Sequence, residues 1–147
     1  MIPRLVKTFD TAGRGAKAIY AGGTFSMAVD VHDLLYFWGQ TKSTGEATMY
    51  PKNVTDLNGW AVRSVGCSNK SIVLAADESV VSWGPSPTYG ELGYGELKKS
   101  STIPSEVKPL DGIHIHHVST GYGHSLFIAR EENDEDKKLI ENLPEWP

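Results

Sequence analysis

Ser125 is a candidate nucleophile, because it follows His124 in the run Gly-His-Ser-Leu-Phe at 123–127. This run superficially resembles the Gly-x-Ser-x-Gly turn that presents the nucleophile of serine hydrolases. Phe127 replaces the closing glycine, and no histidine follows Ser125, where such an enzyme has its base. Ser and His at a loop-to-strand junction commonly bond main-chain groups that lack a ladder partner, so we expect both to be structural. A hydrolase centred on Ser125 is the alternative.

Three imidazoles within four residues raise the question of a metal site. On a strand, His114 and His116 would share one face and His117 would lie on the other. Two ligands on one face, without a nearby cysteine or a convergent carboxylate, make a weak case for a bound metal. We expect no metal or other cofactor here, and we keep a metalloenzyme that uses His114 and His116 as an alternative.

The glycine-rich run at 89–95 is a candidate phosphate cradle. It matches neither a P-loop nor a dinucleotide fingerprint, since no Lys-Ser or Lys-Thr pair closes it and no helical pattern follows. Glu91 would also repel a phosphate. The glycines favour instead a tight loop with positive φ angles, anchored by Leu92 beneath it.

Composition describes an ordinary folding chain. The 147 residues include 39% hydrophobic residues, 15 Gly and 8 Pro, and their formal net charge is −4. This charge excludes a globally basic nucleic-acid binder. No stretch approaches the ~18 apolar residues of a membrane span, and a single cysteine, Cys67, cannot form a disulfide framework. The opening residues lack the apolar core of a signal peptide, so we expect the nucleus or cytosol.

The whole net charge lies at the C-terminal end, in Arg130 and the tail that follows it at 131–147. Residues 131–136 are too polar to bury by this reasoning, whereas Leu139, Ile140 and Leu143 could form a small apolar face before Pro144 ends any helix. We expect a solvated acidic extension, with a partner-binding arm as the weaker alternative.

The chain repeats itself. Ser26, Trp38 and Gly39 recur 45 residues later as Ser71, Trp83 and Gly84, and a third copy opens at 121–125, where the first Gly and the Ser match 22–26. The middle copy departs from this pattern because its glycine, Gly66, is one place out of step. A repeat of this length is typical of solenoids and propellers.

Each unit has the pattern of short strands. Residues 25–29 with 35–38, and 72–75 with 80–83, read as hairpins, and they are nearly continuously apolar, which predicts strands covered on both faces. Weaker strands follow at 50–54 and 104–108, and an inner strand at 62–65. About four strands per ~50 residues is the layout of a propeller blade, in which Trp38 and Trp83 would fill the wedge between blades.

These residues carry a family resemblance. The run at 83–93 resembles the Trp-Gly…Gly-Glu-Leu-Gly signature of the regulator of chromosome condensation repeat family, and 121–125 is similar to its Gly-x-x-His-Ser element. The likeness covers nearly the whole chain, although the first copy lacks the Leu-Gly ending after Gly39. Besides the Ser, Trp and Gly positions named above, the two motifs add further repeat positions, which are Gly90, Leu92, Gly93, Gly121, His124 and Ser125.

The resemblance implies an all-β, seven-bladed β-propeller closed by strands from both chain ends. Seven units of ~50 residues need ~350, so we expect an arc of about two and a half blades, from a fragment or an incomplete gene model. In this division, 1–18 holds the last strand of a preceding blade and a connector that includes 13–17. Two blades occupy 19–59 and 60–112, 113–130 opens a final blade, and 131–147 is the tail.

The resemblance also implies a function. It indicates a non-catalytic protein-binding scaffold whose partners include small GTPases. Some relatives promote nucleotide exchange on these GTPases. The resemblance also implies a role at chromosomes, centromeres and the mitotic spindle. The loops at 40–48 and 85–99 are the candidate contacts, and Lys98 and Lys99 could touch an acidic partner. We expect no membrane contact. A DNA or chromatin contact is a further alternative, disfavoured by the neutral body and acidic tail.

Overall fold

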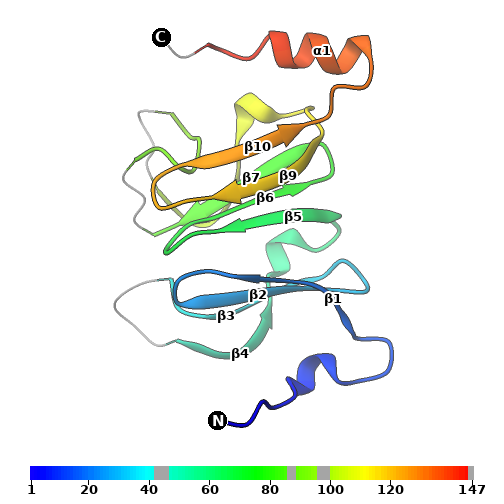
Figure 1. Ribbon diagram of the computed structural model, residues 1–147, viewed down its shortest axis with the longest axis vertical. Helices are drawn as coiled ribbons and strands as arrows, with labels where there is room; N and C mark the ends of the chain where they lie inside the picture. The colour runs from blue at the N-terminus through cyan, green and yellow to red at the C-terminus, as the bar shows by residue number, and fades with distance from the viewer. Residues whose placement is uncertain (42–46, 86–88, 96–99, 146–147) are drawn as a thin grey trace.

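The computed structural model describes residues 1–41, 47–85, 89–95 and 100–145. In these ranges three antiparallel sheets follow one another along the chain, and Figure 1 shows them stacked from the N-terminus to the C-terminus. The expected all-β class is confirmed. The first sheet comprises β1 (Ala16–Ala21), β2 (Phe25–Asp30), β3 (Leu35–Gly39) and β4 (Thr48–Asn53). The second comprises β5 (Val62–Cys67), β6 (Ile72–Ala76), β7 (Ser79–Gly84) and β8 (Ser101–Glu106), and the third β9 (Ile115–Thr120) and β10 (Ser125–Ala129).

The strands lie in each sheet in chain order, so each strand is joined directly to its neighbour, through a tight turn between β6 and β7 and through the long segment 85–100 between β7 and β8. Short 3-10 turns, η2 (Thr55–Leu57) and η3 (Lys108–Leu110), lead from each outer strand to the next inner strand. Pro51 and Pro104 lie in the outer strands β4 and β8, where the free edge tolerates a residue without an N–H. The expected four-strand unit is therefore present twice.

The core lies between the sheets. Along β6 every residue is buried: Ile72 and Leu74 pack into a cluster shared with the first sheet, while Val73 and Ala75 pack into a second cluster shared with the third sheet. This two-sided burial is the physical reason for the continuously apolar sequence. Each sheet is thus stabilised mainly by its neighbours, as in a repeat protein.

The N-terminal segment differs from expectation. Residues 3–7 form no strand with any described residue, and a 3-10 turn, η1 (Lys7–Phe9), follows. The Phe9 ring packs edge-on against Tyr36, with 5.2 Å between ring centroids, and lies 6.3 Å from Trp38. The expected connector at 13–17 is also too long, because β1 begins at Ala16. The residues of β1 are mostly small and have a low intrinsic preference for strands, and they form a strand because they pair with β2.

The C-terminal tail forms a short helix, α1 (Asp134–Glu141), which lies beyond β10 in Figure 1. The side chain of Asn133 caps it by accepting a hydrogen bond of 2.8 Å from the main chain of Asp136. The expectation that 131–136 stays out of the interior is wrong for Asp136, which is only 6% exposed. Leu139 and Leu143 pack against the second cluster, as their spacing predicted. No helix in the described ranges is long and apolar enough to cross a membrane.

Candidate protein-interaction surface

Loops gather at one end of the three sheets, on the left of Figure 1. We call this the loop end, and its described residues are 22–24, 68–70, 89–95 and 121–123. The opposite end, which we call the turn end, carries the short turns that join β2 to β3 and β6 to β7. Loops held on a packed sheet scaffold are the usual place for partner contacts. The contacts that fix these loops therefore determine the shape of this candidate surface.

The first loop of each sheet is closed by the same main-chain hydrogen bond. Gly22 donates to the carbonyl of Phe25, Ser68 to that of Ser71, and Gly121 to that of His124, each at 2.9 Å. Ser71 therefore occupies the position of Phe25 and His124. The sequence comparison, which paired Ser71 with Ser26, is one residue wrong, because Ile72 is the partner of Trp83 as Ser26 is the partner of Trp38, and the β6–β7 hairpin is therefore one residue shorter than the β2–β3 hairpin.

The signature loop at 89–95 is anchored from beneath. Gly90 and Gly93 have φ angles of +86° and +76°, so the expected positive-φ loop is confirmed. Leu92 is buried in the second cluster, and its carbonyl accepts a hydrogen bond of 2.8 Å from the hydroxyl of Ser82. The hydroxyl of Tyr94 donates to the carbonyl of Ser82 in return. The loop is held to β7 by both its apolar and its polar groups.

Ser125 ties this loop to the third sheet. Its hydroxyl donates to the carbonyl of Glu91 at 2.7 Å, instead of to an imidazole. The neighbouring His124 covers Gly121 at the mouth of the β9–β10 hairpin. For Ser125 this is the main-chain bonding that the residue types predicted, and among the described residues no imidazole pairs with its hydroxyl, as the nucleophile of a hydrolase would require.

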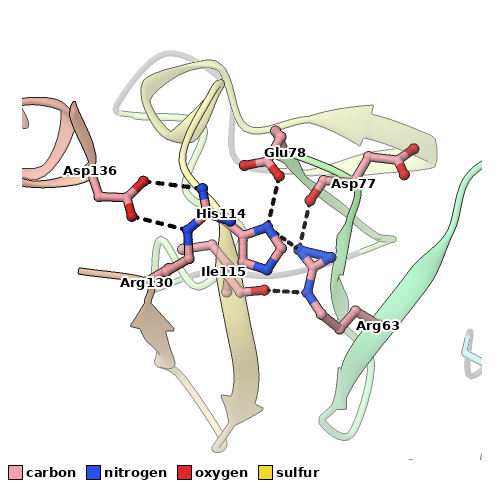
Figure 2. A network of polar contacts seen from close by, with 7 residues as sticks. All are labelled: Arg63, Asp77, Glu78, His114, Ile115, Arg130 and Asp136. Atoms are coloured by element: carbon pink, nitrogen blue, oxygen red, sulfur yellow. Dashed lines mark hydrogen bonds and ion pairs between the residues drawn. The ribbon is translucent and has the colours of Figure 1, made fainter. Parts of the chain in front are cut away.

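At the turn end, Arg63 links the second and third sheets (Figure 2). Its Nε donates to the carbonyl of Ile115 at 2.9 Å, and its Nη2 donates to the carbonyl of Asp77 at 2.6 Å. The adjacent Ser64 hydroxyl accepts a hydrogen bond of 3.0 Å from the main chain of Val118. Two consecutive side chains of β5 thus satisfy main-chain groups on the edge of β9, which would otherwise be unpaired.

Sequence reasoning missed why a basic residue stands at position 63. The strand register shifts between Ala16 and Ala18, and again between Val62 and Ser64, so Lys17 and Arg63 are the extra residues of equivalent β-bulges. Lys17 forms an ion pair with Asp33, and Arg63 bonds to Asp77. Both aspartates have positive φ, 66° and 50°. A bulge turns the side chain of its extra residue toward the hairpin turn, and the alternation of polar and apolar residues along a strand does not predict this.

His114 and His117, at the start of the third sheet, take part in polar contacts of the protein itself. Nδ1 of His114 lies 2.7 Å from a carboxylate oxygen of Glu78 and 3.3 Å from Nη2 of Arg63 (Figure 2). The rings of His114 and His116 lie 5.1 Å apart, consistent with their expected common face. Nδ1 of His117 lies 3.3 Å from the Ser64 hydroxyl. Among the described residues, no group of three or more His, Cys, Asp and Glu side chains could hold a metal ion.

An ion pair fixes the C-terminal tail at the turn end. Arg130 donates from Nε and Nη2 to the two carboxylate oxygens of Asp136, at 3.0 and 3.2 Å (Figure 2). The hydrogen bond from Arg130 lowers the pKa of Asp136 below its usual value, and the main-chain N–H groups of Glu132 and Asn133 act in the same direction. A bidentate pair of this kind fixes orientation as well as distance. It holds the start of α1 beside the third sheet.

The tryptophans occupy equivalent strand positions with different surroundings. Trp83 packs against the cluster between the first and second sheets, as expected for a wedge residue. Trp38 lies on the outer face of the first sheet, where Phe9 is its aromatic neighbour. Cys67 contacts Met27 with 3.8 Å between the sulfur atoms, and burial raises the pKa of its thiol to about 12. The possible contact residues Lys98 and Lys99 lie outside the described residues.

The two sequence motifs and the fold now point to one family. The model of the regulator of chromosome condensation (RCC1) repeat matches residues 77–128. Over 147 residues, the chain is 58% identical to Protein RCC2 of Homo sapiens, covering 99% of this chain and 28% of that protein. Residues 77–128 are an RCC1 repeat, and the likeness to an RCC1-family protein extends over nearly the whole chain. Its sheets are blades of an RCC1-type β-propeller, and the chain forms an arc of one.

Solved RCC1 propellers have the same fold. Yeast RCC1 (Prp20) in its complex with Kap60 matches with a TM-score of 0.66 and 20% identity, covering 90% of this chain and 34% of that chain. Prp20p from Saccharomyces cerevisiae, described with its binding properties to Gsp1p and histones, matches with a TM-score of 0.66 and 18% identity, covering 90% and 35%. The chain spans less than a third of the human RCC1-family relative reported above.

Proposed function

We propose that this chain is part of a non-catalytic protein-binding scaffold that contacts a small GTPase and acts in chromosome and spindle regulation during mitosis. Its 58% identity to human Protein RCC2 is the observation that supports this most strongly. The yeast relative Prp20p, which has binding properties to Gsp1p and histones, supports a protein partner and a location at chromosomes in the nucleus. No residue is assigned to nucleotide exchange.

The loop end is the proposed contact surface. Its loops are anchored by hydrogen bonds such as that from Ser125 to Glu91, so they present a fixed surface at low entropic cost. The loops differ between copies, whereas the packed strands beneath them are alike. Variation confined to loops on a constant scaffold is typical of binding surfaces.

Binding can be tested with the 147-residue chain and a panel of purified small GTPases, each in its GDP, GTP and nucleotide-free form. We expect at least one to bind, and fluorescent GDP release will show whether exchange is stimulated. Asn69→Arg, at the loop end, should weaken binding about tenfold or more by steric exclusion, whereas the matched Asn58→Arg at the turn end should not. Absence of binding across the panel would refute the GTPase assignment, and equal effects of the two variants would refute the surface.

A further inference from the structure

Two exposed tyrosines face each other at the loop end, across the junction of the second and third sheets. Tyr89 is 67% exposed and Tyr122 is 76% exposed, with ring centroids 6.1 Å apart at 47°. They line a cavity of about 260 Å³. A Cβ placed on Gly123 would lie 2.8 Å from Cδ2 of Tyr89, so that ring is seated directly on the main chain of the β9–β10 loop. Large aromatic groups left exposed on a rigid loop are typical of interface anchors.

Glu91 places a negative charge in the wall of the same cavity. The residue is only 8% exposed, and one carboxylate oxygen accepts a hydrogen bond of 3.0 Å from the main chain of Tyr89. The other lies 3.5 Å from the Ser71 hydroxyl, at the outer limit of a hydrogen bond. A carboxylate accepts about four hydrogen bonds, and the described residues give the Glu91 carboxylate these two. A buried carboxylate attracts a cation more strongly than an exposed one.

Lys70 also lines the cavity, and it argues for the opposite ligand. Its ammonium stands on a long, partly exposed stem and can turn into solvent, whereas Glu91 is held in place by its loop. The fixed charge of the site is therefore negative. Aromatic faces likewise attract cations rather than anions.

We propose that this cavity, bounded by Tyr89, Tyr122 and Glu91, receives an arginine side chain of the partner protein. A planar guanidinium can stack on a tyrosine ring while it donates to a carboxylate in its own plane, and a lysine ammonium cannot do both as well. This inference rests on the proposed role as a protein-binding scaffold. It adds the chemistry by which the loop end selects its partner.

The probe for this pocket is N-acetyl-arginine N-methylamide, titrated into the chain and followed by two-dimensional NMR. We expect saturable shifts at 68–71, 89–91 and 121–123, with a Kd on the order of millimolar for a single side chain. The citrulline analogue, which has the same shape without the charge, should bind about tenfold more weakly. Preferential binding of N-acetyl-glutamate N-methylamide would overturn the proposal in favour of a Lys70 site.

Two variants separate recognition from folding. Tyr122→Ala removes an exposed ring and Glu91→Gln removes the charge with little change in shape, and each should weaken the arginine probe about tenfold. The matched control is Tyr50→Ala, because Tyr50 is equally exposed but lies on β4. Probe binding that all three variants leave unchanged would refute the pocket.

The same variants distinguish this proposal from the GTPase assignment. If a GTPase binds wild-type chain and Tyr122→Ala equally and the arginine probe does not bind, the pocket is wrong and the function stands. If the probe binds as described and no GTPase of the panel binds, the pocket stands and the partner class is wrong. Loss of both interactions in Tyr122→Ala supports both.

Discussion

Gly121 donates its N–H to the carbonyl of His124 at 2.9 Å, and the His124 ring lies so close that a Cβ on Gly121 would be 2.3 Å from its Cε1 atom. The first sheet has the same arrangement, with a Cβ on Gly22 2.3 Å from the Phe25 ring. In the second sheet both partners change together, because Ser68 and Ser71 replace the glycine and the ring. The loop thus needs either a glycine beneath a ring or two small residues.

The glycine substitutions should differ in cost despite equal crowding. Phe25 is 4% exposed and cannot leave its cluster, so Gly22→Ala should destabilise by about 1–3 kcal/mol. His124 is exposed and can swing outward, so Gly121→Ala should cost less than about 1 kcal/mol. Urea unfolding of both variants measures the difference. Equal losses would show that the ring's burial does not determine the cost.

The equivalent tryptophans give a second comparison. Trp83→Ala removes a side chain that packs between two sheets, so it should destabilise by up to about 3 kcal/mol. Trp38→Ala should cost clearly less, because its face is covered only in part by the N-terminal segment that carries Phe9. Thermal unfolding followed by near-ultraviolet circular dichroism checks the order. The reverse order would contradict stabilisation by neighbouring sheets.

Much of the architecture could be predicted from sequence because the hairpin strands are apolar on both faces. Predicted strands at 72–75 and 80–83 correspond to β6 (Ile72–Ala76) and β7 (Ser79–Gly84). The outer strands were placed two to three residues late, since Val54 and Val107 carry strand-like side chains but lead into 3-10 turns. Local propensity does not distinguish a strand's end from an apolar anchor that follows it.

The polar contacts between sheets were the least predictable part. Arg63 donates to the carbonyl of Ile115, 52 residues away. Glu91 is held in its buried position because the Ser125 hydroxyl bonds to its main-chain carbonyl and the Tyr89 main chain bonds to its carboxylate. Asp136 is buried because Arg130 meets it across a turn. Arg63 and Glu91 each have a partner 52 and 34 residues away, respectively, and Asp136 meets Arg130 only because the chain turns back between them, so the composition of the local run indicates the wrong environment.

The Arg130–Asp136 pair predicts a pH dependence with a definite sign. Because the pKa of Asp136 is lower in the folded protein than in the unfolded chain, the pair's contribution is complete above the ordinary aspartate pKa and is lost as the pH falls through the folded value. Tm should therefore be lower for Asp136→Asn than for wild type at pH 7, and the gap should close under acid. Asp134→Asn, two residues earlier in the same first turn of α1 and exposed, is the control. A gap that widens in acid would contradict the assignment.

The thiol of Cys67 tests the junction between the first two sheets. Burial raises its pKa to about 12, so almost no thiolate is present at pH 8, and alkylation by iodoacetamide should be far slower than in the chain unfolded in urea. The free energy of unfolding should also fall as the pH rises above about 9, where the unfolded thiol ionises and the folded thiol does not. Cys67→Ala should lack that part of the alkaline decline. Rapid labelling of the native chain at pH 8 would show that the cluster around Met27 opens readily.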